Sequence, residues 1–300
     1  MVTDIIVTGL RTRLAAELAA PCARYRPFVV NGANVGWIDD ARAERLDAFA
    51  DVLVVDAHRI AFAAALESTR ARTLAIDRIA RALAAEGKLT AWRDERYAVV
   101  PRFGATPCFV IERAAARYFG IHTFAAHING LVRTPGEARM WLARRSERKA
   151  IDPGLLDNLV GGGIAAGSSV QATVIKEAGE EAGISTALAR EAQAVGMVHI
   201  CRARPDGLQR ETIFVHDLAV PDVFLPTATD GEVSAFRLER LADAAQFAAA
   251  SEGPDVITAD ASLVIVDCLI RLGEIRRDTP DLATLGALRY PTLTPARVAG

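Results

Sequence analysis

Apolar positions recur with the period of a helix in three stretches of the chain. In residues 69–86, Ile76, Ile79 and Leu83 fall on one face, and Gly87 follows as a stop signal. This stretch therefore predicts an amphipathic helix. Two further helices are predicted over residues 10–20 and 259–272.

Shorter apolar runs between turn residues predict strands. Asn31-Gly32 and Pro205-Asp206-Gly207 each lie between two apolar runs, so we expect hairpins around both turns. Strands are predicted over residues 28–38 (the first hairpin), 51–55, 122–132, 139–143, 159–163, 195–203, 210–218 and 233–238. From about residue 119 to 275 strands alternate with helices.

A glycine-rich strand end and a short loop precede a helix that carries Glu177, Glu180 and Glu181. Ser168 and Gln171 form a Ser-x-x-Gln capping box, which predicts the helix start. Residues three and four apart share one helix face, so the three carboxylates project together. Clustered oxygen ligands suit Mg²⁺, which typically adds phosphate oxygens and waters. The helix therefore predicts metal-assisted phosphate chemistry, and a solvated acidic face is the alternative.

The same stretch resembles the Nudix box, a glycine followed at fixed spacing by a glutamate-rich helix. The positions in register are Gly162, Glu177, Glu180, Glu181, Gly183 and Ile184. Two positions depart from the pattern, because Ser168 stands where glutamate is expected and Lys176 where arginine is expected. Lysine keeps the positive charge but loses the bidentate geometry of arginine.

The first part of the chain resembles the N-terminal extension of one Nudix subgroup, whose members include thiamine-pyrophosphokinase-associated proteins. The resemblance is carried by the runs that begin at Phe28, Trp92 and His127. It implies an α/β (α+β) fold: a Nudix α/β/α sandwich with a mixed sheet, preceded by a smaller α+β domain. The implied domains are residues 1–118, 119–275 and a C-terminal arm, 276–300. We expect the arm to pack on the surface or, in a homodimer, against the partner subunit.

The resemblance also implies roles for individual residues. Glu177, Glu180, Glu181 and the Gly162 carbonyl are expected to hold Mg²⁺, with Mn²⁺ as the alternative metal. Lys176 is expected to orient Glu177 or the loop. Glu232 is expected to complete the site as a ligand or a base, with Glu211 in reserve. The residues expected to contact substrate are Lys149, Asp157, Asn158 and Arg144, although the basic run around them also fits a solvated face.

The function implied is that of a Mg²⁺-dependent pyrophosphohydrolase acting on a small diphosphate. The subgroup resemblance points to thiamine diphosphate or its oxidised forms, cleaved to the monophosphate and phosphate. Nucleotide sugars, dinucleotides and nucleoside triphosphates stay open as substrates. Two rivals are a non-catalytic sensor, favoured by Ser168 and Lys176, and an isomerase that uses Cys201.

Charge, N-terminal sequence and cysteine spacing indicate which partners and which compartment to expect. A formal net charge of −2 gives no electrostatic reason to expect nucleic acid or an anionic membrane. The N-terminus lacks a signal-peptide pattern, and the apolar run 263–270 is too short to span a bilayer. The four cysteines are scattered, which predicts reduced core residues in a cytoplasmic protein.

Overall fold

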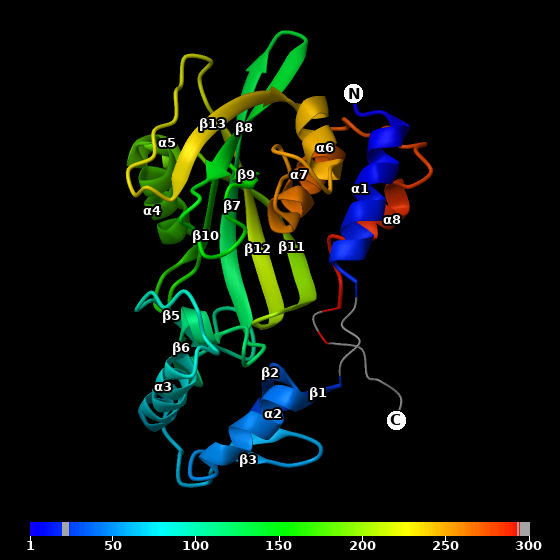
Figure 1. Cartoon of the computed structure of the whole chain (residues 1–300). Coiled ribbons are helices and arrows are strands. Elements are labelled where there is room, and N and C mark those ends of the chain that lie inside the picture. Colours follow the sequence, from blue (N-terminus) through cyan, green and yellow to red (C-terminus); the bar gives the residue numbers. More distant parts are fainter. Residues whose placement is uncertain (20–23, 293, 295–300) are drawn as a thin grey trace.

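A seven-stranded mixed sheet is the largest element of the computed structural model, which describes residues 1–19, 24–292 and 294 (Figure 1). Its main path is β11-β12-β7-β8-β13, with β10 paired to β7 and β9 to β8. The strands are β7 (His122–Thr134), β8 (Glu137–Arg145), β9 (Leu156–Asn158), β10 (Val160–Gly163), β11 (Gln193–Arg204), β12 (Gly207–Ala219) and β13 (Val233–Arg240). The sheet is mixed because β12 runs parallel to β7 while the other pairs are antiparallel.

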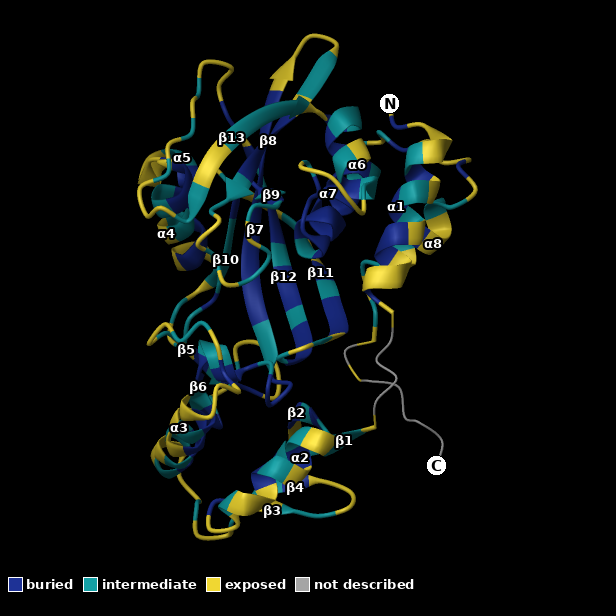
Figure 2. Cartoon of the chain, in the orientation of Figure 1, coloured by how far each residue is buried: buried dark blue, intermediate teal, exposed yellow. Residues whose placement is uncertain are grey.

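Helices cover both faces of this sheet. One face packs against α4 (Val170–Ala182) and α5 (Thr186–Ala189), and the other against α6 (Leu241–Ala249) and α7 (Ala259–Arg271). On β7, Ile128 faces the α4 side and Leu131 the α7 side, so the strand is buried on both faces (Figure 2). The predicted α/β/α sandwich with a mixed sheet is confirmed.

The N-terminal unit has a separate core and a four-stranded sheet in the order β2-β1-β4-β3. Phe28 lies at the centre of this core, with its ring centroid 5.8 Å from that of Phe109 and 6.1 Å from that of Phe119. The elements are β1 (Tyr25–Val30), β2 (Ala33–Asp39), α2 (Asp40–Leu46), η1 (Asp47–Phe49), β3 (Leu53–Val55), β4 (Ile60–Phe62), α3 (Thr69–Ala85), β5 (Arg96–Val99), β6 (Phe109–Glu112) and η2 (Arg113–Ala115).

Backbone hydrogen bonds join the N-terminal unit to the large sheet. The amide of Ala166, in the loop before α4, donates to the carbonyl of Arg96 on β5 at 2.7 Å. At the start of β12, the amide of Leu208 donates to the carbonyl of Arg117 at 2.9 Å. The short strands β5 and β6 therefore lie against the loop that leads into the acidic helix.

The first and last helices pack on the large sheet's α7 side. Leu10 and Leu14 of α1 (Asp4–Glu17) share a core with Leu263 of α7, and Leu285 of α8 (Leu282–Ala287) joins the same core. Packing thus groups residues 4–17 with the second unit, whereas the sequence assigned them to the first because they precede it in the chain. The predicted arm 276–300 packs on α1 as far as the structure describes it.

Most predicted elements are present, with two corrections. The helices at 69–86 and 259–272 are confirmed, and so is the turn at Asn31-Gly32, where both residues have positive φ. The helix predicted over 10–20 instead spans 4–17, and residue 20 lies outside the described residues. Ser168 is not the helix cap: Ser169 is, and its hydroxyl accepts from the Ala172 amide at 3.1 Å. In the described part of the chain, no helix is long and apolar enough to cross a membrane.

Candidate functional site

The glycine-rich end of β10 lies directly against the acidic helix α4. A Cβ atom at position 162 would lie 2.4 Å from Cγ of Glu177, so only glycine lets the helix approach the strand this closely with Glu177 in place. The helix ends at Gly183, which has the left-handed φ of 64° that favours glycine. The structure therefore gives a physical reason for glycine at both positions, 162 and 183.

Glu181 is the most buried carboxylate of the acidic helix, with 6% of its surface exposed. Its Oε2 accepts a hydrogen bond from the Gly161 amide at 2.9 Å, and Nζ of Lys149 lies 3.7 Å from its Oε1. Burial raises the pKa of Glu181 to about 8, although Lys149 and the Gly161 amide act in the opposite direction. A buried carboxylate of this kind is stabilised by any cation that reaches it.

Asp230 and Glu232 bring two further carboxylates to Glu181. One oxygen from each of the three lies within 4.8 Å of the others, which fits a hard divalent cation. Burial alone would raise the pKa of Glu232, but hydrogen bonds from Lys149 and Arg93 outweigh it and lower that pKa to about 2. Sequence reasoning missed Asp230, whose only signal was its position two residues before Glu232.

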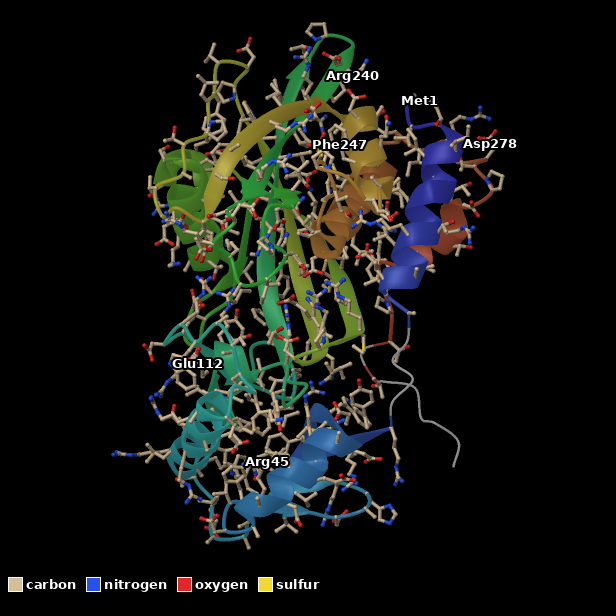
Figure 3. The ribbon with its side chains drawn as sticks, viewed as in Figure 1. Met1, Arg45, Glu112, Arg240, Phe247 and Asp278 are labelled. Atoms are coloured by element: carbon tan, nitrogen blue, oxygen red, sulfur yellow. The ribbon has the colours of Figure 1, made fainter. Side chains whose placement is uncertain are left out.

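Arg93 reaches this cluster from the N-terminal unit. Its guanidinium donates to the carboxylate of Glu232, 139 residues further along the chain. Glu112, labelled in Figure 3, is buried and accepts from the Arg93 amide at 3.0 Å, which positions the arginine. The sequence did not single out Arg93, because nothing local indicates a partner so far away.

Glu177 and Glu180 share one cation, Lys176. The lysine Nζ lies 2.9 Å from a carboxylate oxygen of Glu177 and 2.8 Å from one of Glu180. Glu180 is about half exposed, whereas burial raises the pKa of Glu177. The helix face thus divides into a buried Glu181, directed at β10, and a lysine-bridged pair nearer the solvent.

The structure brings two of the four predicted substrate residues to one cavity. Lys149 and Asp157 line it, and Asp157 also pairs with Arg145 at 2.8 Å. Asn158 is buried in the strand layer, where its amide oxygen accepts a hydrogen bond from the His127 ring at 2.8 Å. Arg144 lies outside the cavity. Its guanidinium donates to the carbonyls of residues 154 and 254 and to Asp255, and so it braces two loops.

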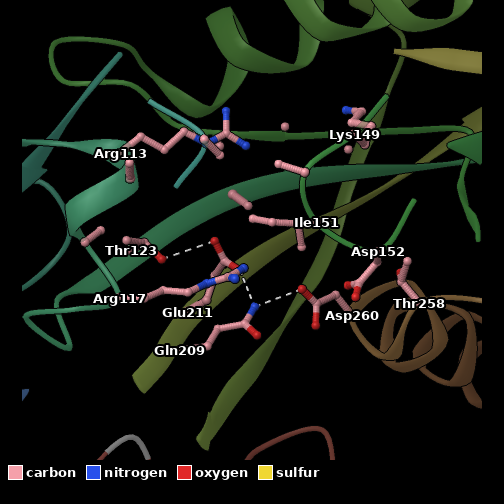
Figure 4. Close-up of a pocket in the computed structure, with 18 of the residues that line it drawn as sticks. Arg113, Arg117, Thr123, Lys149, Ile151, Asp152, Gln209, Glu211, Thr258 and Asp260 are labelled. Carbon is pink, nitrogen blue, oxygen red and sulfur yellow. Dashed lines mark hydrogen bonds between the residues drawn. The ribbon is translucent and has the colours of Figure 1, made fainter. Parts of the chain in front are cut away.

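The cavity lies between the N-terminal unit and the large sheet and has a volume of about 160 Å³ (Figure 4). Its lining includes Arg93, Tyr97, Arg113 and Arg117 from the N-terminal unit, and Thr123, Lys149, Gly161, Gly162, Gly163, Gln209, Glu211 and Asp260 from the rest. On the floor, the Gln209 amide donates to Glu211 at 3.1 Å and to Asp260 at 2.9 Å. Cys201 is buried and is not among the described residues that line the cavity, so the isomerase alternative loses its nucleophile.

Comparison with known proteins divides the chain into two regions. Residues 13–123 match a domain of unknown function, DUF4743, and residues 124–260 match the NUDIX domain. Nudix hydrolase 24, chloroplastic, of Arabidopsis thaliana is 38% identical over 258 residues, covering 85% of this chain and 70% of the relative. Nudix hydrolase 20, chloroplastic, of the same plant is 36% identical over 265 residues, with the same coverage of each chain.

A solved structure, the NUDIX domain of Shewanella oneidensis NrtR complexed with ADP ribose, is similar at a lower level. It is 16% identical, covers 51% of this chain and 90% of its own, and has a TM-score of 0.41. This likeness is too weak to carry any property over to the present chain.

Proposed function

Because the chain belongs to the Nudix hydrolase family, we propose that its hydrolase activity cleaves a small molecule bearing a diphosphate, at the carboxylate cluster beside α4. The observation that carries the proposal is the convergence of Glu181, Asp230 and Glu232 beside a cavity lined by Gly161, Gly162 and Lys149. Three carboxylates placed together and next to an open space suit a metal and a phosphate at once.

The donor set fits Mg²⁺, with Mn²⁺ as the alternative. In this proposal Glu181, Glu177, Glu180 and the Gly162 carbonyl hold the metal, and Asp230 and Glu232 complete its surroundings. A divalent cation held there would neutralise charge on the diphosphate oxygens and acidify the attacking water.

The chain's own residues bind the diphosphate and handle the proton. Lys149, which is almost fully buried between Glu181 and Glu232, is placed to bind a phosphate oxygen once a metal competes for these carboxylates. Lys176 holds Glu177 at 2.9 Å and so orients it toward the strand. Glu232 is the candidate base or a further metal ligand, and Arg93 fixes its position beside the cluster.

We further propose thiamine diphosphate or its oxidised forms as substrates, hydrolysed to the monophosphate and phosphate. Support for this choice comes from the resemblance of the N-terminal runs to the thiamine-pyrophosphokinase-associated subgroup. Nucleoside diphosphate derivatives are the alternative. For the compartment we propose the cytoplasm, since the three described cysteines are buried and unpaired, although both plant relatives are named chloroplastic.

The test is release of phosphate or monophosphate from a panel of diphosphates with Mg²⁺. The panel contains thiamine diphosphate, its oxidised analogues, ADP-ribose and a dinucleotide. Glu181→Gln removes a carboxylate oxygen expected to hold the metal and should abolish turnover, whereas Glu191→Gln, on an exposed side chain, is the matched control. Turnover that survives in Glu181→Gln would place the reaction at another site.

A further inference from the structure

One wall of the cavity carries a phenol with no partner. Tyr97, on β5 of the N-terminal unit, is 7% exposed, and its hydroxyl makes no hydrogen bond with any residue that the structure describes. The hydroxyl points at β10, where a Cβ on Gly163 would lie only 2.0 Å from it. Arg113 lies over the ring, 5.8 Å from its centroid, and fixes its orientation. The hydroxyl is not among the fully enclosed side-chain atoms that lack a partner, so it opens on the cavity and is placed to donate to a ligand there.

The floor of the cavity carries a carboxylate whose partners are both neutral. Glu211, on β12, accepts from the Thr123 hydroxyl at 3.2 Å and from the Gln209 amide at 3.1 Å (Figure 4). Among the described residues no ion pair includes Glu211. A carboxylate offers about four lone-pair sites, so Glu211 keeps accepting capacity toward the cavity.

The neighbouring acids differ from Glu211 because each has a cation of its own. Asp260 pairs with Arg202 at 2.9 Å, and Asp206 pairs with Arg117 at 3.2 Å. These pairs hold the cavity's walls together. Glu211 is therefore the acid of the floor that a ligand's donors can approach without breaking an ion pair.

We propose that this cavity binds the organic half of the substrate, that Glu211 determines which organic half is accepted, and that Tyr97 holds the molecule at its diphosphate end. The chemical class is a nitrogen heterocycle whose edge presents N–H donors to Glu211. The Tyr97 hydroxyl lies next to Gly163, whose neighbour Gly162 is expected to hold the metal. It therefore donates to the diphosphate end of the same molecule. The N-terminal unit thus supplies one wall of the specificity site. This assignment rests on the proposed diphosphate hydrolysis.

The first experiment compares two substrates in each variant. Thiamine diphosphate carries an aminopyrimidine with N–H donors, and methyl diphosphate has no heterocycle. Glu211→Gln keeps the size of the side chain, and we expect the ratio of kcat/KM for thiamine diphosphate over methyl diphosphate to fall roughly tenfold or more, mainly through KM. Glu191→Gln should leave that ratio at the parent's value. An unchanged ratio in Glu211→Gln overturns the inference.

Tyr97→Phe gives a second test that does not disturb folding. The hydroxyl has no hydrogen bond to lose, so the melting temperature should match that of the parent, while KM for thiamine diphosphate rises several-fold. A KM equal to the parent's would remove Tyr97 from the site.

A binding measurement separates this inference from the proposed function. Thiamine monophosphate is titrated calorimetrically into the parent and Glu211→Gln without any turnover. Weaker binding in the variant supports the cavity assignment even if no diphosphate is hydrolysed. Absence of binding to the parent, together with normal hydrolysis that Glu181→Gln abolishes, overturns the inference and leaves the proposed function standing.

Discussion

The ammonium group of Lys149 lies 3.7 Å from the carboxylate of Glu181, and both side chains are about nine-tenths buried. The same ammonium donates to Glu232, so one lysine stands between two carboxylates of the proposed metal site. Lys149 is thus the internal cation of the cluster. A divalent cation bound at these oxygens would take over part of that task.

Removing this cation should make stability depend on metal. In Lys149→Met, Glu181 loses its buried positive partner while Glu232 keeps Arg93, and such a loss typically costs about 3 kcal/mol of unfolding free energy. We expect the melting temperature to fall with EDTA present and Mg²⁺ to raise it more than in the parent. Lys88→Met, at an exposed lysine, is the control. Equal responses to Mg²⁺ in Lys149→Met and the parent would contradict a metal at these carboxylates.

Gly162→Ala should impair the site while leaving the fold intact. The new Cβ would lie 2.4 Å from Cγ of Glu177, and the glutamate side chain can swing away where backbone could not. We expect turnover to fall by an order of magnitude or more, in line with displaced catalytic groups. Gly196→Ala, where nothing lies within 4 Å of the added atom, should behave as the parent. Circular dichroism and steady-state kinetics on both variants test this.

The cap of α4 can be located by mutation. Ser169→Ala removes the hydroxyl that accepts from the Ala172 amide, so the free energy of unfolding should fall by about 1 kcal/mol. Ser168→Ala removes a side chain outside the cap and should cost less. Urea denaturation of the two variants measures the difference. A larger loss in Ser168→Ala would restore the capping box expected from sequence.

His122 should make the protein sensitive to acid. Burial, helped by Arg210 and His199, lowers the pKa of His122 from 6.5 to about 3. The unfolded chain therefore binds a proton that the folded protein does not, and stability present above pH 6.5 is lost as the pH falls toward 3. The loss approaches about 1.4 kcal/mol per pH unit.

The measurement is the unfolding free energy of His122→Gln and the parent between pH 7 and 4. We expect the variant to lose less stability than the parent over this range. His58→Gln, at an exposed histidine, should follow the parent's curve. Parallel curves for His122→Gln and the parent would show that His122 takes up its proton in the folded state.

Lys176 illustrates what the sequence alone can predict, because its partners are close to it in the chain. Lys176 and Glu180 stand four residues apart on one helix, so their pairing follows from helix geometry, and the long lysine side chain also reaches Glu177 beside it. The register of Gly162 with Glu177 was equally visible, because the spacing of a strand, a loop and a helix is local. Asn31-Gly32 predicted its turn for the same reason, since positive φ is a property of the residues themselves.

Which residues from distant segments join these local elements depends on the tertiary structure. Arg93, in the loop before β5, and Tyr97, on β5 itself, line the cavity although no periodicity in the sequence predicted this segment. Arg93 pairs with Glu232 only because the folded chain brings the two segments together. Arg144 has the same charge as Arg145 and Lys149, yet β8 directs it to the loop at Pro254 and Asp255. The acidic helix, its glycine partner and most individual strands of the large sheet could be predicted from sequence, because each depends on residues close together in the chain. The pairing of those strands could not, since β12 pairs with β7 across about 88 residues. The convergence of Glu181 with Glu232, the pairing of Lys149 and Arg93 with these carboxylates, and the lining of the cavity join segments about 30 to 139 residues apart, and only the folded chain specifies them.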